Sequence, residues 1–272
     1  IHMNKIIGFL TVLIITCQAY AQQTESFPYK LGYADFFYVP AGISLYGGGK
    51  ILENRIETID KAAILQLDRQ TINGFDRLAT RKWSENIDRC SDVTLGISWL
   101  APSLVILPEL FNKRWSNFAT LGLMYFETGI LTLSITELTK AWVQRKRPYL
   151  YNTNLSIDKR TELAGDKSSY KSFFSGHSSM AFTTAVFCAT TYSDIYGRTK
   201  LTPFVWAGAL GIAGLTAYLR VEAGKHYPSD ILVGAAVGSL IGYTVPKLHK
   251  IKNENLSVSL SGNYISIVYC LR

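Results

Sequence analysis

PFVWAGALGIAGLTAYL (residues 203–219) and ILVGAAVGSLIGYTV (residues 231–245) are two apolar stretches separated by a short, mostly polar segment. Each approaches the ~20 residues that a helix needs to cross the hydrocarbon core of a bilayer. Glycine and alanine recur in both stretches, as is usual where helices pack closely. The two stretches therefore predict a pair of tightly packed, very apolar helices.

Three further apolar segments lie upstream, at residues 93–110, 117–138 and 178–192. Together the five segments predict an all-α fold, a helical bundle with five or six transmembrane helices. Glu127 and Glu137 fall within the second of these upstream segments, and charges there must face the interior of the bundle. A soluble bundle with very apolar core helices would show a similar pattern, and the sequence leaves this alternative open.

The composition narrows the class of partner but not the compartment. Hydrophobic residues make up 48% of the 272 residues and charged residues 18%, which does not separate a soluble from a membrane protein. The net charge of +8 favours acidic partners such as anionic lipid and phosphate esters. Nucleic acid is disfavoured because the sequence has no zinc-finger spacing and no aromatic-basic RNA-binding motif. The four cysteines form no CxxC pair and predict no metal site, and nothing in the sequence specifies an oligomeric state.

Residues 1–21 have the pattern of a cloning remnant, Ile1-His2-Met3, followed by a secretory signal peptide. Lys5 gives a positive start to the apolar run 6–16, and Ala19-Tyr20-Ala21 places small residues where a signal peptidase reads them. We expect cleavage after Ala21. The alternative is an uncleaved first membrane helix, although the run is short for a span.

The rest of the chain divides into three parts. Residues 22–92 are mixed and mostly polar, and apolar residues at helical spacing over 61–73 and 76–90 predict an N-terminal helical region on the surface. Residues 93–248 are the expected catalytic core, a helical bundle. The tail, residues 249–272, alternates polar and apolar residues and predicts short strands.

Loop charges orient the five segments relative to a membrane. If the mature N-terminus lies outside, the inside loops are 111–116 and 193–202, and the inside tail begins after residue 246. Asp194 is the nearby acidic residue, and the basic residues are Lys113, Arg114, Arg198, Lys200, Lys247, Lys250 and Lys252. Segments 139–177 and 220–230 then lie together on the outer face, which in a bacterial inner membrane is the periplasmic face.

The first polar cluster follows directly after the segment that holds Glu137. Lys140 and Arg147 are seven apart, so on a helix they share one face, and Pro148 ends that helix. Two cations aimed in one direction can bind a dianion, and arginine can bind it bidentately. A solvated basic helix end that anchors to anionic lipid is the alternative, because the residues next to Arg147 add a charge run with no evident target.

The second cluster, at residues 172–179, opens an apolar helix. Backbone N–H groups at a helix start are free to hold an anion, Ser175 can add a hydroxyl, and Gly176 lets the backbone approach closely. His177 could then donate a proton to a leaving oxygen. A serine helix cap beside an incidental histidine is the alternative.

The third cluster lies between the last two apolar segments. Pro228 marks the first turn of a helix, with His226 just before it and Asp230 within its first turns. An imidazole oriented and made basic by a carboxylate is suited to act as a nucleophile or base. The alternative is a structural His–Asp pair. By the loop charges, all three clusters share one face, where three cations, two histidines and one aspartate suit phosphoryl transfer.

The three clusters resemble the tripartite signature of the type-2 phosphatidic acid phosphatase and vanadium haloperoxidase superfamily, written K-x6-RP, PSGH and SR-x5-H-x3-D. Lys140 through Arg147-Pro148 matches the first part in full. Phe174-Ser175-Gly176-His177 matches the second part, with Phe for the usual Pro. Leu219-Arg220 through His226 and Asp230 matches the third, with Leu for the usual Ser. The resemblance covers roughly residues 90–246.

The resemblance implies a role for each matched residue, and it implies no metal or other cofactor. His226 attacks phosphorus and forms a phosphohistidine, Asp230 orients and polarises His226, and His177 protonates the leaving group. The phosphate oxygens are held by Lys140, Arg147, Arg220, Ser175 and Gly176.

The expected function is therefore that of a phosphatase in the bacterial inner membrane, with a periplasmic active site, acting on a lipid phosphate or diphosphate. Candidate substrates are undecaprenyl diphosphate, phosphatidylglycerol phosphate and the phosphates of lipid A. Three alternatives stay open. The first is a soluble periplasmic acid phosphatase for small phosphomonoesters, the second a vanadium-dependent haloperoxidase, for which the chain is short. The third is a non-enzymatic membrane protein that binds anionic lipid through its basic face.

Overall fold

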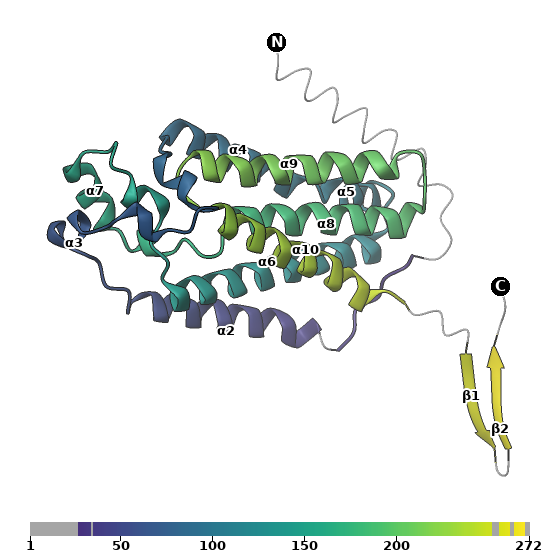
Figure 1. Ribbon diagram of the computed structural model, residues 1–272. Helices are drawn as coiled ribbons and strands as arrows, with labels where there is room; N and C mark the ends of the chain where they lie inside the picture. Colours follow the sequence, from purple (N-terminus) through teal and green to yellow (C-terminus); the bar gives the residue numbers. More distant parts are fainter. Residues whose placement is uncertain (1–26, 34, 252–255, 262–263, 270–272) are drawn as a thin grey trace.

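The computed structural model describes residues 27–33, 35–251, 256–261 and 264–269. The cloning remnant and signal peptide predicted for residues 1–21 lie outside the described residues. The described part is helical apart from one isolated bridge and one hairpin, which confirms the prediction of a helical fold (Figure 1).

A bundle of seven helices forms the body of the described chain (Figure 1). These helices are α2 (Asp35–Glu53), α4 (Glu85–Leu100), α5 (Ser103–Phe111), α6 (Trp115–Val143), α8 (Gly176–Tyr196), α9 (Thr202–Glu222) and α10 (Pro228–His249). One end of the bundle carries a cap of short elements, which are α3 (Lys61–Leu65), η2 (Arg69–Thr71), η3 (Arg77–Arg81), η4 (Pro148–Tyr151), α7 (Ile157–Ala164) and η5 (Lys167–Tyr170). Strands β1 (Leu256–Ser261) and β2 (Tyr264–Tyr269) pair antiparallel beyond α10.

Helix α8 lies at the centre of the bundle and contacts α4, α6, α9 and α10. Its buried hydroxyl groups bond to these neighbours: Thr183 Oγ1 donates to the carbonyl oxygen of Gly238 at 3.1 Å, and Ser98 Oγ lies 2.7 Å from Thr184 Oγ1. A buried polar group must find such a partner. The hydroxyls of α8 therefore fix its position and rotation in the bundle.

Three glycines of α10 allow it to pack directly against the backbone of α8. A Cβ atom on Gly234, Gly238 or Gly242 would lie only 2.7, 2.0 or 2.4 Å from a carbonyl oxygen of α8 or of its N-cap residue Ser175. The glycines are four residues apart and share one helix face, the spacing that lets helix backbones approach closely. This contact brings the start of α10 beside the start of α8, where the second and third sequence clusters lie.

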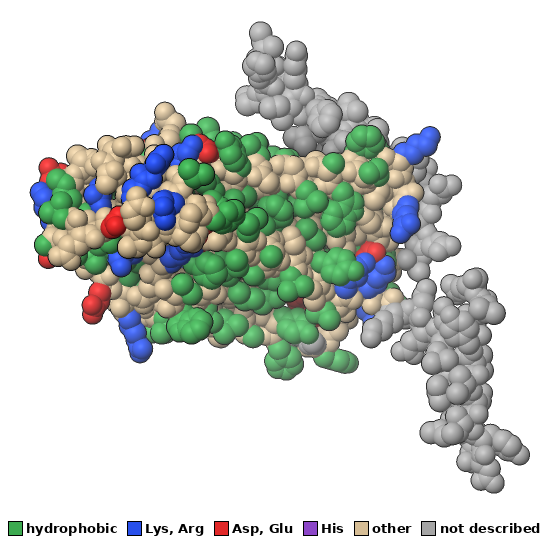
Figure 2. Space-filling view, viewed as in Figure 1, with side chains coloured by type: hydrophobic (Ala, Val, Ile, Leu, Met, Phe, Trp, Pro, Cys, Tyr) green, Lys and Arg blue, Asp and Glu red, His purple; other side chains and the backbone are tan. Residues whose placement is uncertain are grey.

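Among the residues that the structure describes, four helical segments are long and apolar enough to cross a membrane, where five or six were predicted for the chain. They are Glu85–Phe111, Trp115–Tyr151, Thr202–Glu222 and Pro228–His249. The predicted segment 178–192 falls in α8, where the Ser and Thr side chains that bond inside the bundle lower the mean hydropathy. Figure 2 shows hydrophobic side chains over the middle of the bundle and blue Lys and Arg side chains toward both ends.

The two glutamates of α6 face the interior of the bundle, as predicted. Glu137 pairs with Lys171 at 2.6 Å and with Lys50 at 3.2 Å, near the cap. Glu127 is 3% exposed and lies 3.3 Å from His249, near the far end of α10. Both charges therefore avoid the outer surface of α6.

The predicted surface helices over 61–73 and 76–90 are broken into shorter pieces. Three side chains cap new helix starts: Asp60 accepts from Ala63 N, Asp68 from Gln70 N and Ser84 from Ile87 N. Each cap satisfies a backbone N–H that a continuous helix would bond internally, so a new helical segment begins after each capping residue. Helix α4 consequently begins at Glu85 and carries its first turns into the capped end of the bundle.

Candidate active site

The three sequence clusters meet at the capped end of the bundle. The first occupies the end of α6 and the turn after it, the second the start of α8, and the third the turn from α9 to α10 (Figure 1). The charges of Lys140, Arg147 and Arg220, together with His177, all act on the imidazole of His226. These five residues, all selected in the sequence analysis, therefore lie close together.

The turn from α9 to α10 holds His226 in a fixed position. The carbonyl oxygen of Arg220 accepts hydrogen bonds from Lys225 N at 3.1 Å and from His226 N at 3.3 Å. Gly224 has φ +73°, and a Cβ atom there would lie 2.1 Å from the carbonyl oxygen of Lys82. Only glycine fits this turn without strain. His226 is 1% exposed as a result of its packing beneath the cap.

A backbone carbonyl orients the His226 ring. Nδ1 lies 2.7 Å from the carbonyl oxygen of Ser172, which has no proton to donate, so Nδ1–H is the donor. In the neutral ring Nε2 then carries the lone pair. Asp230 Oδ2 lies 3.7 Å from Nδ1 and instead accepts hydrogen bonds from Ser172 Oγ at 2.5 Å and Tyr227 N at 3.0 Å. Asp230 thus holds Tyr227, the residue after His226, and Ser172, whose carbonyl contacts the ring. The carboxylate therefore orients the ring through Ser172.

The surroundings keep His226 neutral. Complete burial lowers its pKa most, and the cations of Arg147, Arg220 and Lys140 lower the pKa further, well below the ordinary histidine value. Burial and like charges both disfavour an imidazolium. The lone pair on Nε2 is therefore available for attack at neutral pH.

His177, in the first turn of α8, pairs with an aspartate from α4. Its Nε2 lies 2.7 Å from Asp92 Oδ1. Burial and the nearby Arg220 guanidinium lower the pKa of His177 to about 4, against the opposing effect of Asp92. A phosphate dianion bound at Arg220 would offset that guanidinium charge, which returns His177 toward its protonated form.

Arg220 lies among carboxylates of α4 but keeps one donor unused. Its Nη1 contacts Asp88 Oδ1, donates to Ser91 Oγ at 2.9 Å and lies 3.8 Å from Asp92 Oδ1. The buried Nε–H of Arg220 has no hydrogen-bond partner among the described residues. A buried donor of this kind is costly unless a ligand satisfies it.

Lys140 and Arg147 add two further cations with free donors. Lys140 is 9% exposed, and within the described part of the chain its Nζ makes only a long contact to Glu137, at 3.8 Å. Arg147 Nε donates to the carbonyl oxygen of Ser168 at 2.9 Å, and neither of its Nη groups donates to a described residue. Both side chains can therefore donate to a bound anion.

The start of α8 combines a cap with a close approach of Lys140. Ser175 Oγ accepts from Ser178 N at 3.3 Å and is the N-cap of the helix. A Cβ atom on Gly176 would lie 2.9 Å from Lys140 Nζ, so only glycine leaves room for the amino group at this point. The first-turn N–H groups and the Lys140 amino group thereby converge.

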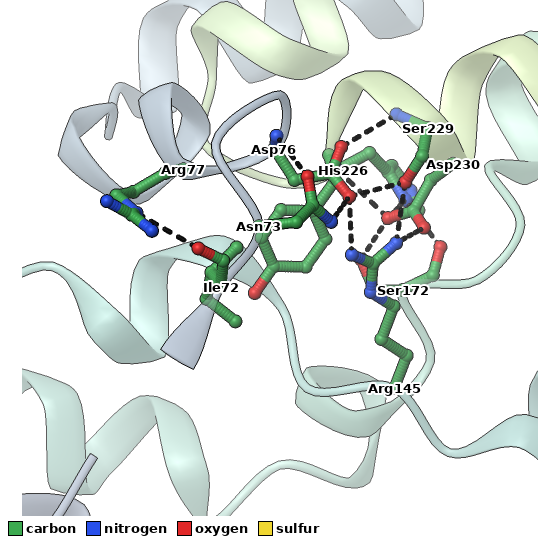
Figure 3. Close-up of polar contacts among 10 residues, drawn as sticks. Ile72, Asn73, Asp76, Arg77, Arg145, Ser172, His226, Ser229 and Asp230 are labelled. Carbon is green, nitrogen blue, oxygen red and sulfur yellow. Dashed lines mark hydrogen bonds and ion pairs between the residues drawn. The ribbon is translucent and has the colours of Figure 1, made fainter. Parts of the chain in front are cut away.

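Sequence reasoning missed Arg145, which it took for part of an untargeted charge run. Its guanidinium bonds to Asp230 Oδ1 at 2.5 Å and to Asp76 Oδ2 at 2.7 Å (Figure 3). The same group lies 3.9 Å from the centre of the Tyr227 ring. Although burial raises the pKa of Asp76, hydrogen bonds from Ser229 and Arg145 outweigh it and lower that pKa. This ion network ties the cap to the start of α10.

Asp88 and Asp92 were also missed, although one signal for them exists. They are four residues apart on α4, so they share a face, and they precede an apolar segment whose start lies at the capped end. Ser172 begins the second cluster, but no pattern in the sequence marks its carbonyl oxygen, which reaches His226 from 54 residues away. Asp76 lies 153 residues from Ser229, which it bonds, and no local pattern marks that contact.

The chain is similar in sequence to two phosphatases of known activity. The chain is 25% identical to the lipid A 4'-phosphatase of Porphyromonas gingivalis over 185 residues, which cover 65% of this chain and 66% of the relative. It is 35% identical to the lipid A 1-phosphatase of the same organism over 80 residues, or 29% of this chain and 17% of that relative. The chain thus spans less than two thirds of the length of either protein.

No solved structure matches the chain. The family model described as the PAP2 superfamily matches residues 118–254, a range that contains all three sequence clusters. This match covers half of the chain and includes His226 and the four residues whose charges act on it, which are Lys140, Arg147, His177 and Arg220. The chain belongs to the PAP2 superfamily and is distantly related to lipid A phosphatases.

Proposed function

We propose that this protein is a metal-independent phosphatase that hydrolyses a lipid phosphate or diphosphate through a phosphohistidine at His226. The observation that carries the proposal is the state of the His226 ring. Nδ1–H is committed to the Ser172 carbonyl at 2.7 Å, burial and three cations keep the ring neutral, and Nε2 is left as the nucleophile.

The cations around His226 supply the phosphate site. The unpaired Nε–H of Arg220, the two Nη groups of Arg147 and the amino group of Lys140 are donors without strong partners among the described residues. A phosphate dianion would satisfy them, together with the N–H groups at the start of α8. Phosphoryl transfer needs this kind of charge neutralisation more than any other assistance.

The reaction takes place in two balanced steps. In the first, Nε2 of His226 bonds to phosphorus while the bond from phosphorus to the leaving oxygen breaks, and protonated His177 gives that oxygen its proton. In the second, water attacks the phosphohistidine, His177 takes up the water proton, and the P–N bond breaks to release phosphate. Asp230 stabilises the positive charge on the His226 ring from 3.7 Å and through Ser172.

The apolar exterior supports a lipid substrate. The four candidate spans surround or adjoin α8, and the site lies at the end of these helices instead of midway along them. A bundle that crosses the inner membrane with α8 as a central fifth helix would hold the site at the periplasmic face. There a phosphorylated headgroup can reach His226 while its acyl or isoprenoid chains stay in the bilayer.

Among lipid phosphates, the phosphates of lipid A are the first candidates, because both curated relatives above are named for that activity. Undecaprenyl diphosphate and phosphatidylglycerol phosphate are the comparison substrates. A sugar phosphate on a bulky lipid would be held through its phosphate by the cation set, which makes no demand on the lipid chains.

The test is a panel of these lipid phosphates, with small phosphomonoesters included, assayed against the detergent-purified protein. We expect phosphate release from a lipid substrate that persists in EDTA during the assay, that vanadate inhibits and that His226→Ala reduces by at least ~10⁴-fold. Full activity in a folded His226→Ala variant would contradict the mechanism. Preference for small phosphomonoesters, with release from membranes by alkaline carbonate, would favour the soluble acid phosphatase instead.

Lipid binding without turnover is the remaining alternative. It predicts binding to anionic vesicles that is unchanged in His226→Ala and His177→Ala and no phosphate release from any lipid in the panel. A burst of radiolabelled phosphate on the wild-type chain after acid-free quenching, absent in His226→Ala, would exclude it, because a phosphohistidine is labile in acid.

A further inference from the structure

A second cluster of ionisable side chains lies at the end of the bundle away from His226. Asp35 begins α2, Glu127 lies within α6 and His249 ends α10. Each offers one ligand atom, and these atoms all lie within 4.8 Å of one another. Nearly the whole of α10, roughly 28 Å at 1.5 Å per residue, separates His249 from Asp230. The cluster is therefore distinct from the candidate active site.

All three side chains are buried. Asp35 is 7% exposed, Glu127 3% and His249 5%. His249 Nε2 lies 3.1 Å from Asp35 Oδ1 and 3.3 Å from Glu127 Oε2. A tetrahedral site with bonds of about 2.1 Å places its ligand atoms about 3.4 Å apart, so these separations fit a shared ion.

The other ring nitrogen of His249 is already committed. Nδ1 lies 2.8 Å from the carbonyl oxygen of Val245, so it carries a proton and donates to that oxygen. A neutral ring in this tautomer directs the Nε2 lone pair at the two carboxylates. Histidines that bind metals usually donate their second N–H to a carbonyl or carboxylate in this way.

The two carboxylates lack sufficient positive charge from the protein. Among the described residues no Lys or Arg pairs with Asp35 or Glu127, and neither oxygen of Glu127 has a hydrogen-bond partner. Asp35 Oδ2 accepts from Gly32 N at 2.7 Å, which leaves Oδ1 directed to His249. With both carboxylates ionised, even an imidazolium would leave the cluster with one net negative charge, and burying such a charge is costly.

We propose that Asp35, Glu127 and His249 bind one divalent transition-metal ion, which joins α2, α6 and α10. Two carboxylates, a neutral imidazole and a 2+ ion sum to zero charge, and imidazole with carboxylate ligands suits Zn²⁺ or Mn²⁺. The ion is structural and remote from phosphoryl transfer. This proposal differs from the sequence analysis, which expected no metal on the basis of the cysteine spacing and the family signature.

The test measures metal uptake by the full chain in detergent, after removal of any affinity tag and treatment with a chelator. Zn²⁺ and Mn²⁺ are added in separate samples, unbound ion is removed, and metal per chain is measured by elemental mass spectrometry. We expect about one ion per wild-type chain and a rise in melting temperature on loading. Glu127→Gln should bind at least ~10-fold more weakly and lose that rise, since it removes a charged ligand.

The matched control is Glu109→Gln. Glu109 is also buried, at 1% exposure, but Asn117 Nδ2 donates to it at 2.8 Å and it lies outside the cluster. This variant should bind metal as the wild type does. Should Glu127→Gln not fold, as judged by size-exclusion chromatography, Asp35→Asn and His249→Gln replace it. Absence of stoichiometric uptake of either ion by the folded wild type would overturn the proposal, as would equal uptake by the folded cluster variants.

Discussion

His226 Nδ1 lies 2.7 Å from the carbonyl oxygen of Ser172, whereas the carboxylate of Asp230 lies 3.7 Å away. The immediate partner of the ring is therefore a backbone group, which no substitution of a side chain removes. Asp230 acts one step further out, since it accepts hydrogen bonds from Ser172 Oγ and Tyr227 N. Because the Ser172 carbonyl contacts the ring directly and Asp230 acts through its neighbours, we expect substitutions of Ser172 and Asp230 to reduce activity to different extents.

Asp230→Asn should reduce kcat by about 10²-fold, and Ser172→Ala by about 10-fold or less. The asparagine keeps an acceptor for Tyr227 N but loses the negative charge that balances Arg145 and the developing charge on His226. The alanine keeps the carbonyl that orients the ring. Steady-state kinetics on the preferred lipid phosphate check the order. A Ser172→Ala variant with a lower kcat than Asp230→Asn would show that the Ser172 hydroxyl, and not its carbonyl, positions His226.

Gly176→Ala should raise KM about 10-fold with a smaller effect on kcat. The added Cβ atom would lie 2.9 Å from Lys140 Nζ, so the amino group must leave its position over the start of α8 and bind phosphate less well. Gly122→Ala on α6 is the matched control, because a Cβ atom there has no neighbour within 4 Å. Equal KM values for the two variants would show that Lys140 does not contribute to phosphate binding.

Asp92→Asn should move the alkaline limb of the kcat–pH profile to lower pH by about one unit. The general acid His177 must be protonated, so kcat falls as pH rises through its pKa in the enzyme–substrate complex. Burial and Arg220 lower the pKa of His177, and Asp92 opposes them. Removing the Asp92 charge therefore lowers the pKa further and starts the fall earlier. An unchanged alkaline limb would mean that another group delivers the proton.

The parts of the site that follow local spacing could be predicted from the sequence. Lys140 and Arg147 flank a helix end, Ser175 caps the helix that His177 enters, and Asp230 lies four residues from His226. The last two relations are set by local geometry at one helix start. The helix predicted to run through Lys140 and Arg147 instead ends at Val143, so Arg147 reaches the site from the turn after α6 and not from the helix face of Lys140. The match to the family signature then identified these segments as one site, which composition could not have done.

The parts that depend on tertiary packing could not be predicted. Arg145 is unremarkable in sequence, and its role follows only when α6, α10 and the cap bring Asp230 and Asp76 to it. The same holds for α8, which the hydropathy pattern predicted as a span. Its Ser and Thr residues are buried because other helices surround α8. The hydropathy of one sequence segment does not show which helices will surround it.

Gly238→Ala should destabilise the bundle and abolish most activity in any protein that still folds. The added Cβ atom would lie 2.0 Å from the carbonyl oxygen of Ser179, and since that atom is backbone, α8 and α10 must separate. Overpacking of this kind costs about 1–3 kcal/mol or more of unfolding free energy. The control is Gly211→Ala on α9, where an added Cβ atom has no neighbour within 4 Å. This variant should melt at or above the wild-type temperature, because alanine favours a helix more than glycine does. Separation of the two helices also pulls His226 and Asp230 away from His177. Thermal unfolding in detergent and phosphate release should therefore fall together in Gly238→Ala, and wild-type values for both would refute the close packing of α8 and α10.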